Sequence, residues 1–233
     1  MKNQKIYYYN KWIGSKSNKI FIRKSPIKNI KIKYSECNIF DLKNVIQSAK
    51  IGYINNKNYS LTERSKILKK ISQVIKSNIR QLARFECLET GKTYQSAFNE
   101  IKYSAELWHS ASRLVKRKLD YKIKQSNGVN VKIVHEPVGI VALIIPWNFP
   151  FIVLSERLPF ILAAGNSVVI KPSEHASQSI VKLLQLLRNL KIKNGILNLV
   201  TGSKKIGELL VKNKNTNMIS FTGSTVAGKK IMK

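Results

Sequence analysis

One amide side chain lies where it could stabilise a negatively charged oxygen. Asn148 belongs to the segment 146–150 (PWNFP), in which two prolines restrict the backbone around it. The segment follows an apolar run at 138–145 that predicts a buried strand, and open α/β sheets bind ligands at the carboxyl ends of their strands. The amide could therefore donate to an oxyanion that develops during acyl chemistry. The local sequence equally allows an asparagine that only hydrogen-bonds the backbone of its own loop.

A turn around residue 223 is a second candidate for ligand binding. Thr222, Gly223 and Ser224 follow an apolar run at 218–221 and begin a segment of helical character. Free N–H groups at a helix N-terminus and the helix dipole attract phosphate groups, Gly223 allows close approach, and Ser224 adds a hydroxyl. An ordinary strand-to-helix turn without a ligand is the alternative.

The elements around these two loops alternate between strand and helix. The runs at 138–145 and 167–170 are apolar throughout, which is typical of parallel strands that are covered by helices on both faces. Two more strands are expected at 196–200 and 218–221, with helices between consecutive strands and after the last one. We therefore predict an α/β fold with a doubly wound, Rossmann-like parallel sheet over residues 137–233.

Residues 1–136 predict an N-terminal region of helices and β-hairpins. Alternating bulky and polar residues indicate an antiparallel hairpin or meander at 5–9, 11–13 and 19–23. Capping and periodicity signals then predict four helices. These are expected from Asn38 to about Lys50, from Thr62, from Asn78 to Gly91, and from about Ser96 to about Lys118.

Three long motifs resemble those of one enzyme family. They are EPVGIVALIIPWNFP at 136–150, AAGNSVVIKPSE at 163–174 and FTGSTVAG at 221–228. In this order and at this spacing they closely resemble the NAD(P)-dependent aldehyde dehydrogenase superfamily, and three motifs in register are far more specific than a lone glycine pattern. Weaker similarity extends back to about Lys5 and forward to Lys233. The resemblance implies an aldehyde dehydrogenase-like fold that is truncated at its C-terminal end.

The resemblance also implies a site for NAD. Lys171 and Glu174 match the family's lysine and glutamate that hold the adenosine ribose hydroxyls. A carboxylate accepts hydrogen bonds from a diol and repels a 2′-phosphate, so Glu174 favours NAD over NADP, although Lys171 partly offsets that repulsion. A solvated ion pair at the end of a strand is the alternative. The cofactor-binding residues that the resemblance implies are Ile144, Pro146, Trp147, Asn148, Lys171, Ser173, Glu174, Gly202, Gly207, Phe221, Thr222, Gly223, Ser224 and Val226.

The resemblance assigns different parts of the cofactor to different segments. The 222–224 turn matches the family's pyrophosphate site, and residues 144, 146 and 147 match positions beside the nicotinamide half. Gly202 and Gly207 resemble a glycine-rich turn after the third strand. Two departures stand out, because Lys204 replaces a glycine that relatives often carry and Asn213 lies where a histidine is usual. The adenine side of the site is therefore expected to be looser.

For a complete member of the family, the resemblance implies oxidation of an aldehyde to a carboxylic acid. A cysteine thiolate attacks the aldehyde, the residue matching Asn148 and a backbone N–H hold the oxyanion, hydride passes to NAD, and a glutamate activates water. The strand with Glu-Leu-Gly-Gly-Lys and the thiol-bearing domain are expected after Lys233. We therefore expect this chain to be the cofactor-binding N-terminal portion, either a truncated product or one half of a split enzyme with a separate C-terminal half, and to be inactive alone. A nucleotide-binding remnant without catalysis is the alternative.

Assembly and the thiols form a further set of expectations. Two alternating runs flank an Asn-Gly pair within 119–135 and predict a hairpin, which in the family builds a homo-oligomer. A hairpin without a partner, protected by its lysines, is the alternative. Cys87 and His109 could act as nucleophile and base, but neither has an evident activating partner, and the family's catalytic cysteine lies downstream of both Cys37 and Cys87. We expect two buried, inert thiols and no metal site.

The formal net charge of +30 admits nucleic-acid binding as another class of function. However, the charge is spread along the chain, and lysines outnumber arginines by 34 to 8, whereas base and phosphate recognition favours the arginine fork. This imbalance is typical of an AT-rich coding bias, and a salt-sensitive shift of DNA or RNA by the protein would contradict that interpretation. Residues 1–10 lack an apolar signal region, and prolines interrupt the run at 138–154. We therefore expect a cytoplasmic protein without a membrane span.

Overall fold

A computed structural model describes residues 3–117, 120–124 and 130–232 of the chain. Within these residues, six strands form a central sheet in the order β10-β7-β8-β9-β1-β2. The first four of these run parallel, β1 pairs antiparallel with β9, and β2 pairs antiparallel with β1 at the edge of the sheet. Their bounds are Ile6–Tyr8 (β1), Lys11–Ile13 (β2), Ile140–Ile145 (β7), Ser167–Pro172 (β8), Leu197–Leu199 (β9) and Met218–Phe221 (β10). The predicted α/β fold with a Rossmann-like parallel sheet is confirmed.

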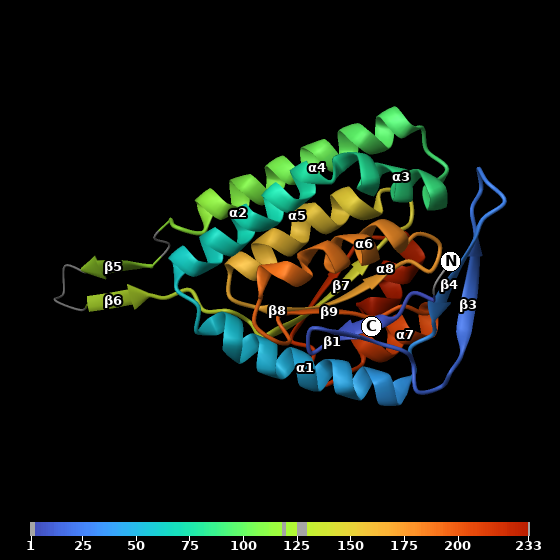
Figure 1. Cartoon of the computed structure of the whole chain (residues 1–233). Coiled ribbons are helices and arrows are strands. Elements are labelled where there is room, and N and C mark those ends of the chain that lie inside the picture. The colour runs from blue at the N-terminus through green and yellow to red at the C-terminus, as the bar shows by residue number, and fades with distance from the viewer. Residues whose placement is uncertain (1–2, 118–119, 125–129, 233) are drawn as a thin grey trace.

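Helices cover both faces of this sheet (Figure 1). α1 and α7 lie against one face, whereas α5 and α6 lie on the other, with α2, α3 and α4 packed outside them. The bounds are Ile39–Lys57 (α1), Leu61–Ser77 (α2), Ile79–Thr90 (α3), Tyr94–Leu114 (α4), Pro150–Ala163 (α5), Gln178–Leu186 (α6), Lys204–Val211 (α7) and Thr225–Ile231 (α8), and a 3-10 turn, Leu187–Leu190, continues α6. The sheet is thus the middle layer between two helical layers.

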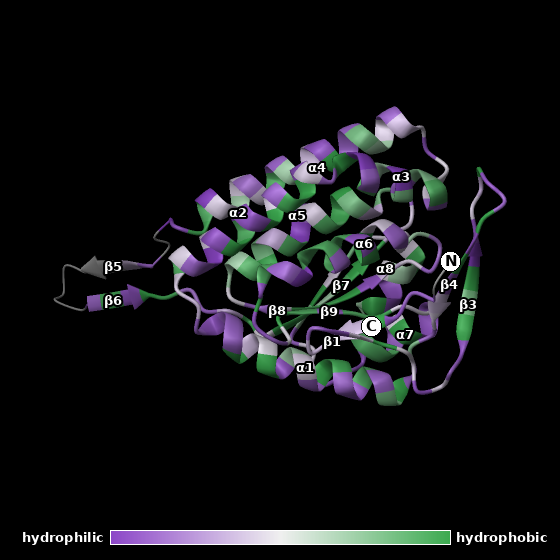
Figure 2. Cartoon of the chain, in the orientation of Figure 1, coloured by the Kyte–Doolittle hydropathy of each residue, from purple (hydrophilic) through white to green (hydrophobic). Residues whose placement is uncertain are grey.

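The two apolar faces of β7 explain why its sequence lacks a polar alternation. Ile140 and Ala142 belong to the core beneath α1, whereas Leu143 and Ile145 belong to the core beneath α5. Figure 2 shows apolar residues on the sheet and on the inward sides of the helices, and polar residues outside. Among the described residues, no helix combines the length and the apolar character needed to cross a membrane.

The register of the parallel strands decides which side chains meet at their carboxyl ends. Ile144 of β7 pairs with Phe221 of β10 on one side and with Lys171 of β8 on the other. Three residues that are up to 77 positions apart in the sequence are therefore neighbours at one edge of the sheet. The loops that leave this edge carry the residues for which the sequence predicts chemistry.

Of the two arrangements predicted for the N-terminal strands, a hairpin or a meander, the structure has the hairpin. β1 and β2 form a hairpin, as expected, and this hairpin joins the central sheet through the pairing of Tyr7 with Leu199. The third predicted run is β3 (Ile20–Lys24), which pairs with β4 (Lys31–Ser35), a strand that the sequence analysis did not predict. The hairpin is therefore not extended into a meander, because β3 finds its partner beyond the 25–30 loop rather than in β2.

Several helix boundaries also move. α1 begins after Asn38, which forms the predicted capping box with Asp41, but it runs to Lys57 instead of ending near residue 50. α2 begins after Ser60, whose capping box with Glu63 replaces the predicted start at residue 62. α4 begins after Thr93 and ends at Leu114, four residues before the expected end. Gly91 ends α3 as predicted, with a left-handed φ of 78°.

The hairpin predicted at 119–135 consists of β5 (Tyr121–Lys124) and β6 (Asn130–Ile133). These strands pair antiparallel, with Tyr121 opposite Ile133. The Asn-Gly turn between them lies outside the described residues. Figure 1 shows the pair projecting from the body of the protein. Its proposed role in assembly stays a prediction.

Candidate functional site

A groove of about 600 Å³ opens at the carboxyl ends of β7, β8 and β10. This volume lies within the roughly 300–1,000 Å³ that is typical of small-molecule sites. Twelve of the fourteen predicted cofactor-binding residues line it: Ile144, Pro146, Trp147, Asn148, Lys171, Ser173, Glu174, Gly207, Phe221, Thr222, Gly223 and Ser224. The strand register therefore gathers three separate sequence motifs into one cavity.

The two remaining predicted residues do not line the groove. Gly202 is buried in the turn before α7, with a φ of 152°, and a Cβ there would lie 2.8 Å from Cγ1 of Ile206. This glycine allows the turn to pack against its own helix. Val226 lies on α8 with 67% of its surface exposed.

The side chain of Asn148 makes the loop hydrogen bond that the sequence allowed, whereas its role as an oxyanion donor stays a prediction. Its Oδ1 accepts a hydrogen bond from the backbone N–H of Phe149 at 3.0 Å, which fixes the amide within the loop. Its Nδ2 makes no hydrogen bond to the described residues, and the loop is exposed at the edge of the groove. The backbone contact therefore orients the amide and leaves its donor side available to a ligand.

Lys171 and Glu174 form an ion pair at the end of β8, with Nζ and Oε2 3.3 Å apart. The pair is partly solvated, because the Lys171 side chain is only 5% exposed whereas that of Glu174 is 33% exposed. Burial lowers the pKa of Lys171, and the Glu174 carboxylate partly opposes this effect. Burial raises the pKa of Glu174, but the Lys171 charge and a backbone hydrogen bond outweigh it and leave the pKa below its usual value. A charged acceptor therefore faces the groove at neutral pH.

The 222–224 turn connects β10 to α8. The N–H of Thr222 donates to the carbonyl of Ile144 at 3.2 Å, which ties the turn to β7. A Cβ on Gly223 would lie 2.6 Å from the Phe221 ring, so a side chain here would have to displace that ring. Ser224 caps α8 by accepting from the N–H of Ala227 at 3.3 Å, and its hydroxyl proton remains able to donate to a ligand.

Charged residues on α7 and α8 complete the groove and were missed by the sequence analysis. Lys204 and Glu208 of α7 and its C-cap residue Lys212 follow one another at intervals of four residues, and Lys230 of α8 also lines the groove. Four-residue spacing places side chains on one face of a helix, so this signal was present once α7 was recognised. Lys204, noted above as a departure, is therefore a rim residue, and it lies 3.8 Å from Glu208.

The two cysteines and the three histidines do not build a second reactive site. Cys37 and Cys87 are buried and form no disulfide, and burial raises the pKa of both thiols. A buried thiol with a raised pKa is a poor nucleophile. Within the described ranges, no group of three or more His, Cys, Asp or Glu side chains has the arrangement of a metal site.

Comparison with known sequences identifies the protein family that this chain matches. The sequence profile of the aldehyde dehydrogenase family matches residues 12–233. A betaine aldehyde dehydrogenase from Bacillus subtilis is 31% identical over 99% of this chain and 48% of its own length. A 3,6-anhydro-alpha-L-galactose dehydrogenase from a Vibrio species is 30% identical over 100% of this chain and 49% of its own length. The chain therefore spans about half the length of the curated relatives it matches.

Solved structures lead to the same family. An NAD-dependent aldehyde dehydrogenase from Sinorhizobium meliloti superposes with a TM-score of 0.95 at 30% identity, over 99% of this chain and 47% of that protein. A betaine aldehyde dehydrogenase from Staphylococcus aureus, solved in complex with NAD+, gives a TM-score of 0.94 at 27% identity, over 98% of this chain and 46% of its own. The resemblance inferred from three sequence motifs is confirmed, and the chain belongs to the aldehyde dehydrogenase family.

Proposed function

We propose that this chain is the dinucleotide-binding portion of an aldehyde dehydrogenase and binds NAD in the groove. The observation that carries the proposal is the parallel register, which brings the loops after β7, β8 and β10 to one cavity of about 600 Å³. Ligands of open α/β sheets bind at such an edge. The solved relatives that contain NAD+ support the choice of cofactor.

The residues of the groove suit the parts of a dinucleotide. The ion pair of buried Lys171 and half-buried Glu174 offers a charged acceptor for a ribose diol and disfavours a 2′-phosphate. The 222–224 turn offers N–H groups and a hydroxyl to a diphosphate, in a space that Gly223 keeps free of a side chain. Trp147 and Asn148 line the groove beside β7, and we assign the nicotinamide ring to this side of it. When bound, the nicotinamide supplies the acceptor for the two electrons that leave an aldehyde.

Aldehyde oxidation itself is proposed for the assembled enzyme. In that assembly Nδ2 of Asn148 donates to the oxyanion of a tetrahedral adduct, which is worth roughly 2.7–4 kcal/mol of barrier where comparable donors have been removed. The nucleophilic thiol and the general base come from the remainder of the enzyme, since the thiols of Cys37 and Cys87 are buried and cannot reach a substrate. We also propose that the β5–β6 hairpin contributes to a homo-oligomer and that the protein works in the cytoplasm.

The first prediction is that NAD stabilises the protein through Glu174. At about one hundred times its Kd, NAD raises the unfolding free energy by about 2.7 kcal/mol, or the Tm by about 5–10 °C for a chain of this size. Glu174→Ala weakens NAD binding about tenfold or more, because a charged hydrogen-bond acceptor is lost, and it narrows the preference for NAD over NADP. Thermal unfolding with increasing NAD and NADP measures both effects.

The matched control is Glu156→Ala, which removes an exposed glutamate of α5 that does not line the groove. It should bind NAD as the unsubstituted protein does. A Tm that does not respond to NAD would contradict the proposed function. Equal losses of affinity in Glu174→Ala and Glu156→Ala would contradict the assigned role of Glu174 alone.

A further inference from the structure

Two helices that begin directly after loops of the groove are not capped by their own side chains. α5 begins at Pro150, immediately after the loop that carries Asn148, and α6 begins at Gln178, four residues after Glu174. Among the described residues, the N-cap residues Phe149 and Ser177 make no side-chain capping bond. The first N–H groups of a buried helix have no acceptor within the helix, so another part of the chain has to supply one.

Glu89, on the last turn of α3, supplies this acceptor to α6. Its Oε2 accepts from the N–H of Ser177 at 2.7 Å and from the N–H of Gln178 at 2.5 Å. The carboxylate is only 2% exposed, and it lies 88 positions before Ser177 in the sequence. A carboxyl oxygen carries partial negative charge even when the group is protonated, so the helix dipole also favours it at a helix N-terminus. Glu89 thus acts as the cap that the sequence of α6 lacks.

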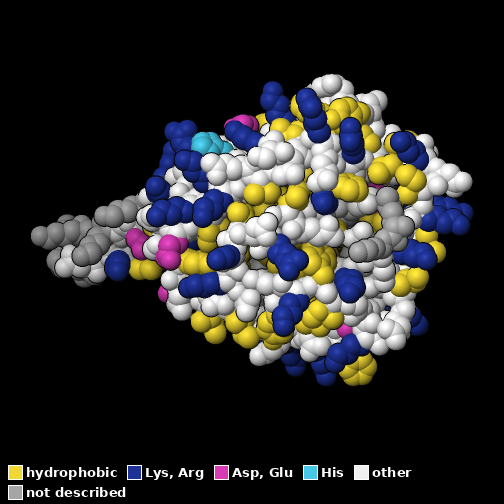
Figure 3. All heavy atoms as spheres, in the orientation of Figure 1, with side chains coloured by type: hydrophobic (Ala, Val, Ile, Leu, Met, Phe, Trp, Pro, Cys, Tyr) yellow, Lys and Arg dark blue, Asp and Glu magenta, His cyan; other side chains and the backbone are white. Residues whose placement is uncertain are grey.

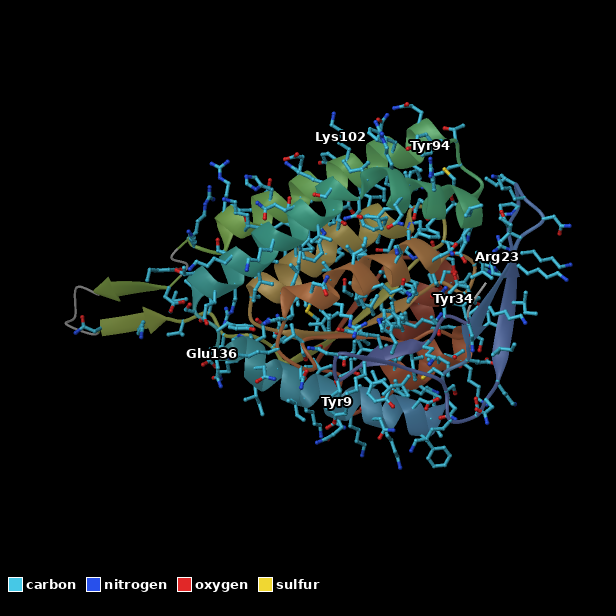
Figure 4. All side chains as sticks on the ribbon, in the orientation of Figure 1. Tyr9, Arg23, Tyr34, Tyr94, Lys102 and Glu136 are labelled. Carbon is cyan, nitrogen blue, oxygen red and sulfur yellow. The ribbon has the colours of Figure 1, made fainter. Side chains whose placement is uncertain are left out.

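The loop between β8 and α6 is held around this contact. Ser177 donates through Oγ to the carbonyl of Ser173 at 2.8 Å, so the turn that contains Glu174 closes on the residue that Glu89 holds. Arg23 of β3 donates to the carbonyl of His175 at 2.9 Å and to that of Glu89 at 3.4 Å. The hydroxyl of Tyr34 on β4 donates to Oε1 of Glu89. Figure 4 shows Arg23 and Tyr34 on the same side of the molecule, beside the β3–β4 hairpin.

A related arrangement holds the start of α5. Glu100 of α4 accepts from the N–H of Ile152 at 3.1 Å, and Glu86 of α3 accepts from the N–H of Phe151 at 3.5 Å. Lys92 bridges the two carboxylates and also lies over the Phe149 ring, 4.3 Å from its centroid. These contacts hold Phe149, whose N–H in turn donates to Asn148. The loop with the catalytic amide is therefore anchored from α3 and α4.

We propose that α3 and α4 position the groove from outside it, with Glu89 fixing the loop that carries Glu174 and Glu100, supported by Glu86, fixing the loop that carries Asn148. These glutamates do not line the groove, so they are positioning residues. The inference rests on the proposed function in that the positioned groups are its ribose acceptor and its oxyanion donor. It assigns the positioning of the site loops to α3 and α4, which contribute no residue to the lining of the groove.

The test compares backbone amide hydrogen exchange, residue by residue, in variants of the full chain. Glu89→Ala should accelerate exchange of the Ser177 and Gln178 amides at least about tenfold and leave the Phe151 and Ile152 amides unchanged. Glu100→Ala should give the reverse pattern. Glu89→Gln keeps an oxygen that can accept from both amides and should retain most of the protection. The exposed Glu106→Ala on α4, whose partner is Lys76, should change neither pair.

NAD titration of the same variants provides the second readout. Glu89→Ala should raise the Kd for NAD at least about tenfold, and Glu89→Gln should restore it to within about threefold. If Glu89→Ala fails to fold, Glu89→Asp carries the test, because its shortened carboxylate withdraws from the amides and both effects should persist in weaker form. Wild-type exchange at Ser177 and Gln178, or an equal acceleration throughout the chain, would overturn the inference. Absence of NAD binding by the unsubstituted chain would refute the proposed function, whereas the exchange pattern would still decide whether Glu89 and Glu100 hold their loops.

Discussion

Gly52→Ala is expected to lower the unfolding free energy by about 3 kcal/mol or more, because a side chain there would enter another backbone. A Cβ on Gly52 of α1 would lie 1.9 Å from the carbonyl oxygen of Gly195 and 2.0 Å from its carbonyl carbon. Gly195 has a φ of 79°, and a Cβ on it would lie 1.9 Å from the carbonyl oxygen of Ser48. Helix α1 and the turn before β9 therefore meet backbone to backbone.

The surrounding hydrogen bonds prevent this contact from relaxing. Asn198 donates to the carbonyl of Gly195 at 2.6 Å and accepts from the hydroxyl of Ser48 at 2.7 Å, so the turn and α1 are linked through one buried side chain. The better helix propensity of alanine, about 1 kcal/mol, is too small to offset the clash. Urea unfolding measures the difference.

Gly14→Ala is the matched control for this prediction, because a Cβ on Gly14 would have nothing within 4 Å. It should change the unfolding free energy by less than about 1 kcal/mol. If Gly52→Ala were as stable as Gly14→Ala, the close approach of α1 to the turn before β9 would be wrong.

The second large effect is a loss of stability as the pH rises from about 5 to about 8. Burial, and next the Glu100 charge, raises the pKa of Glu86 to about 8. Burial raises the pKa of Glu89 to about 7, although its bonds from Tyr34, Gln178 and Ser177 and the charge of Arg23 oppose this. Both values exceed the 4.5 of an unperturbed glutamate. The folded protein therefore binds more protons than the unfolded chain between these limits.

The sign follows from this proton balance. A state that holds extra protons is favoured where protons are abundant, so the stability from these two groups is complete below about pH 4.5 and is lost as the pH rises through about 7 and about 8. The expected loss is on the order of several kcal/mol, since each pKa unit corresponds to about 1.4 kcal/mol. Carboxylates with lowered pKa, such as Glu174, act in the opposite direction and at lower pH, outside this window.

Urea unfolding at a series of pH values between about 5 and about 8 tests the second prediction. The double variant Glu86→Gln/Glu89→Gln, which cannot ionise at either position, should give a flatter profile than the unsubstituted protein. Glu106→Gln, an exposed change, should leave the profile as it is. A profile that is flat or rises with pH in the unsubstituted protein would show that Glu86 and Glu89 are not held in a protonated, buried form.

Positive charge is scattered over the side of the protein that Figure 3 shows. Figure 3 shows lysine and arginine side chains distributed over the visible side of the protein, between patches of apolar and neutral residues. The same scatter was expected from the even distribution of charge along the sequence. The lysines at the rim of the groove differ from the rest in their setting, because α7 and α8 direct them to one cavity.

The parallel strands, the loops of the groove and the family could be predicted from sequence patterns alone. Apolar runs without alternation mark strands that are covered on both faces, and the chemistry-bearing loops follow these strands directly, so short-range pattern was sufficient. The capping pattern that begins at Asn38 likewise predicted the start of α1. The strands, the loops and this helix start are encoded in short consecutive segments, where side-chain type and backbone preference act directly.

The features that depend on contacts between distant segments could not be predicted from the sequence and became evident in the tertiary structure. The pairing of β3 with β4, the addition of β1 to the sheet at β9, and the capping of α6 by Glu89 join segments whose own sequences carry no mark of the contact. In the local sequence, Glu89 cannot be distinguished from any other polar residue of a helix. Its role follows from packing, because a buried carboxyl group needs hydrogen-bond partners, and for Glu89 these come from other elements of the fold.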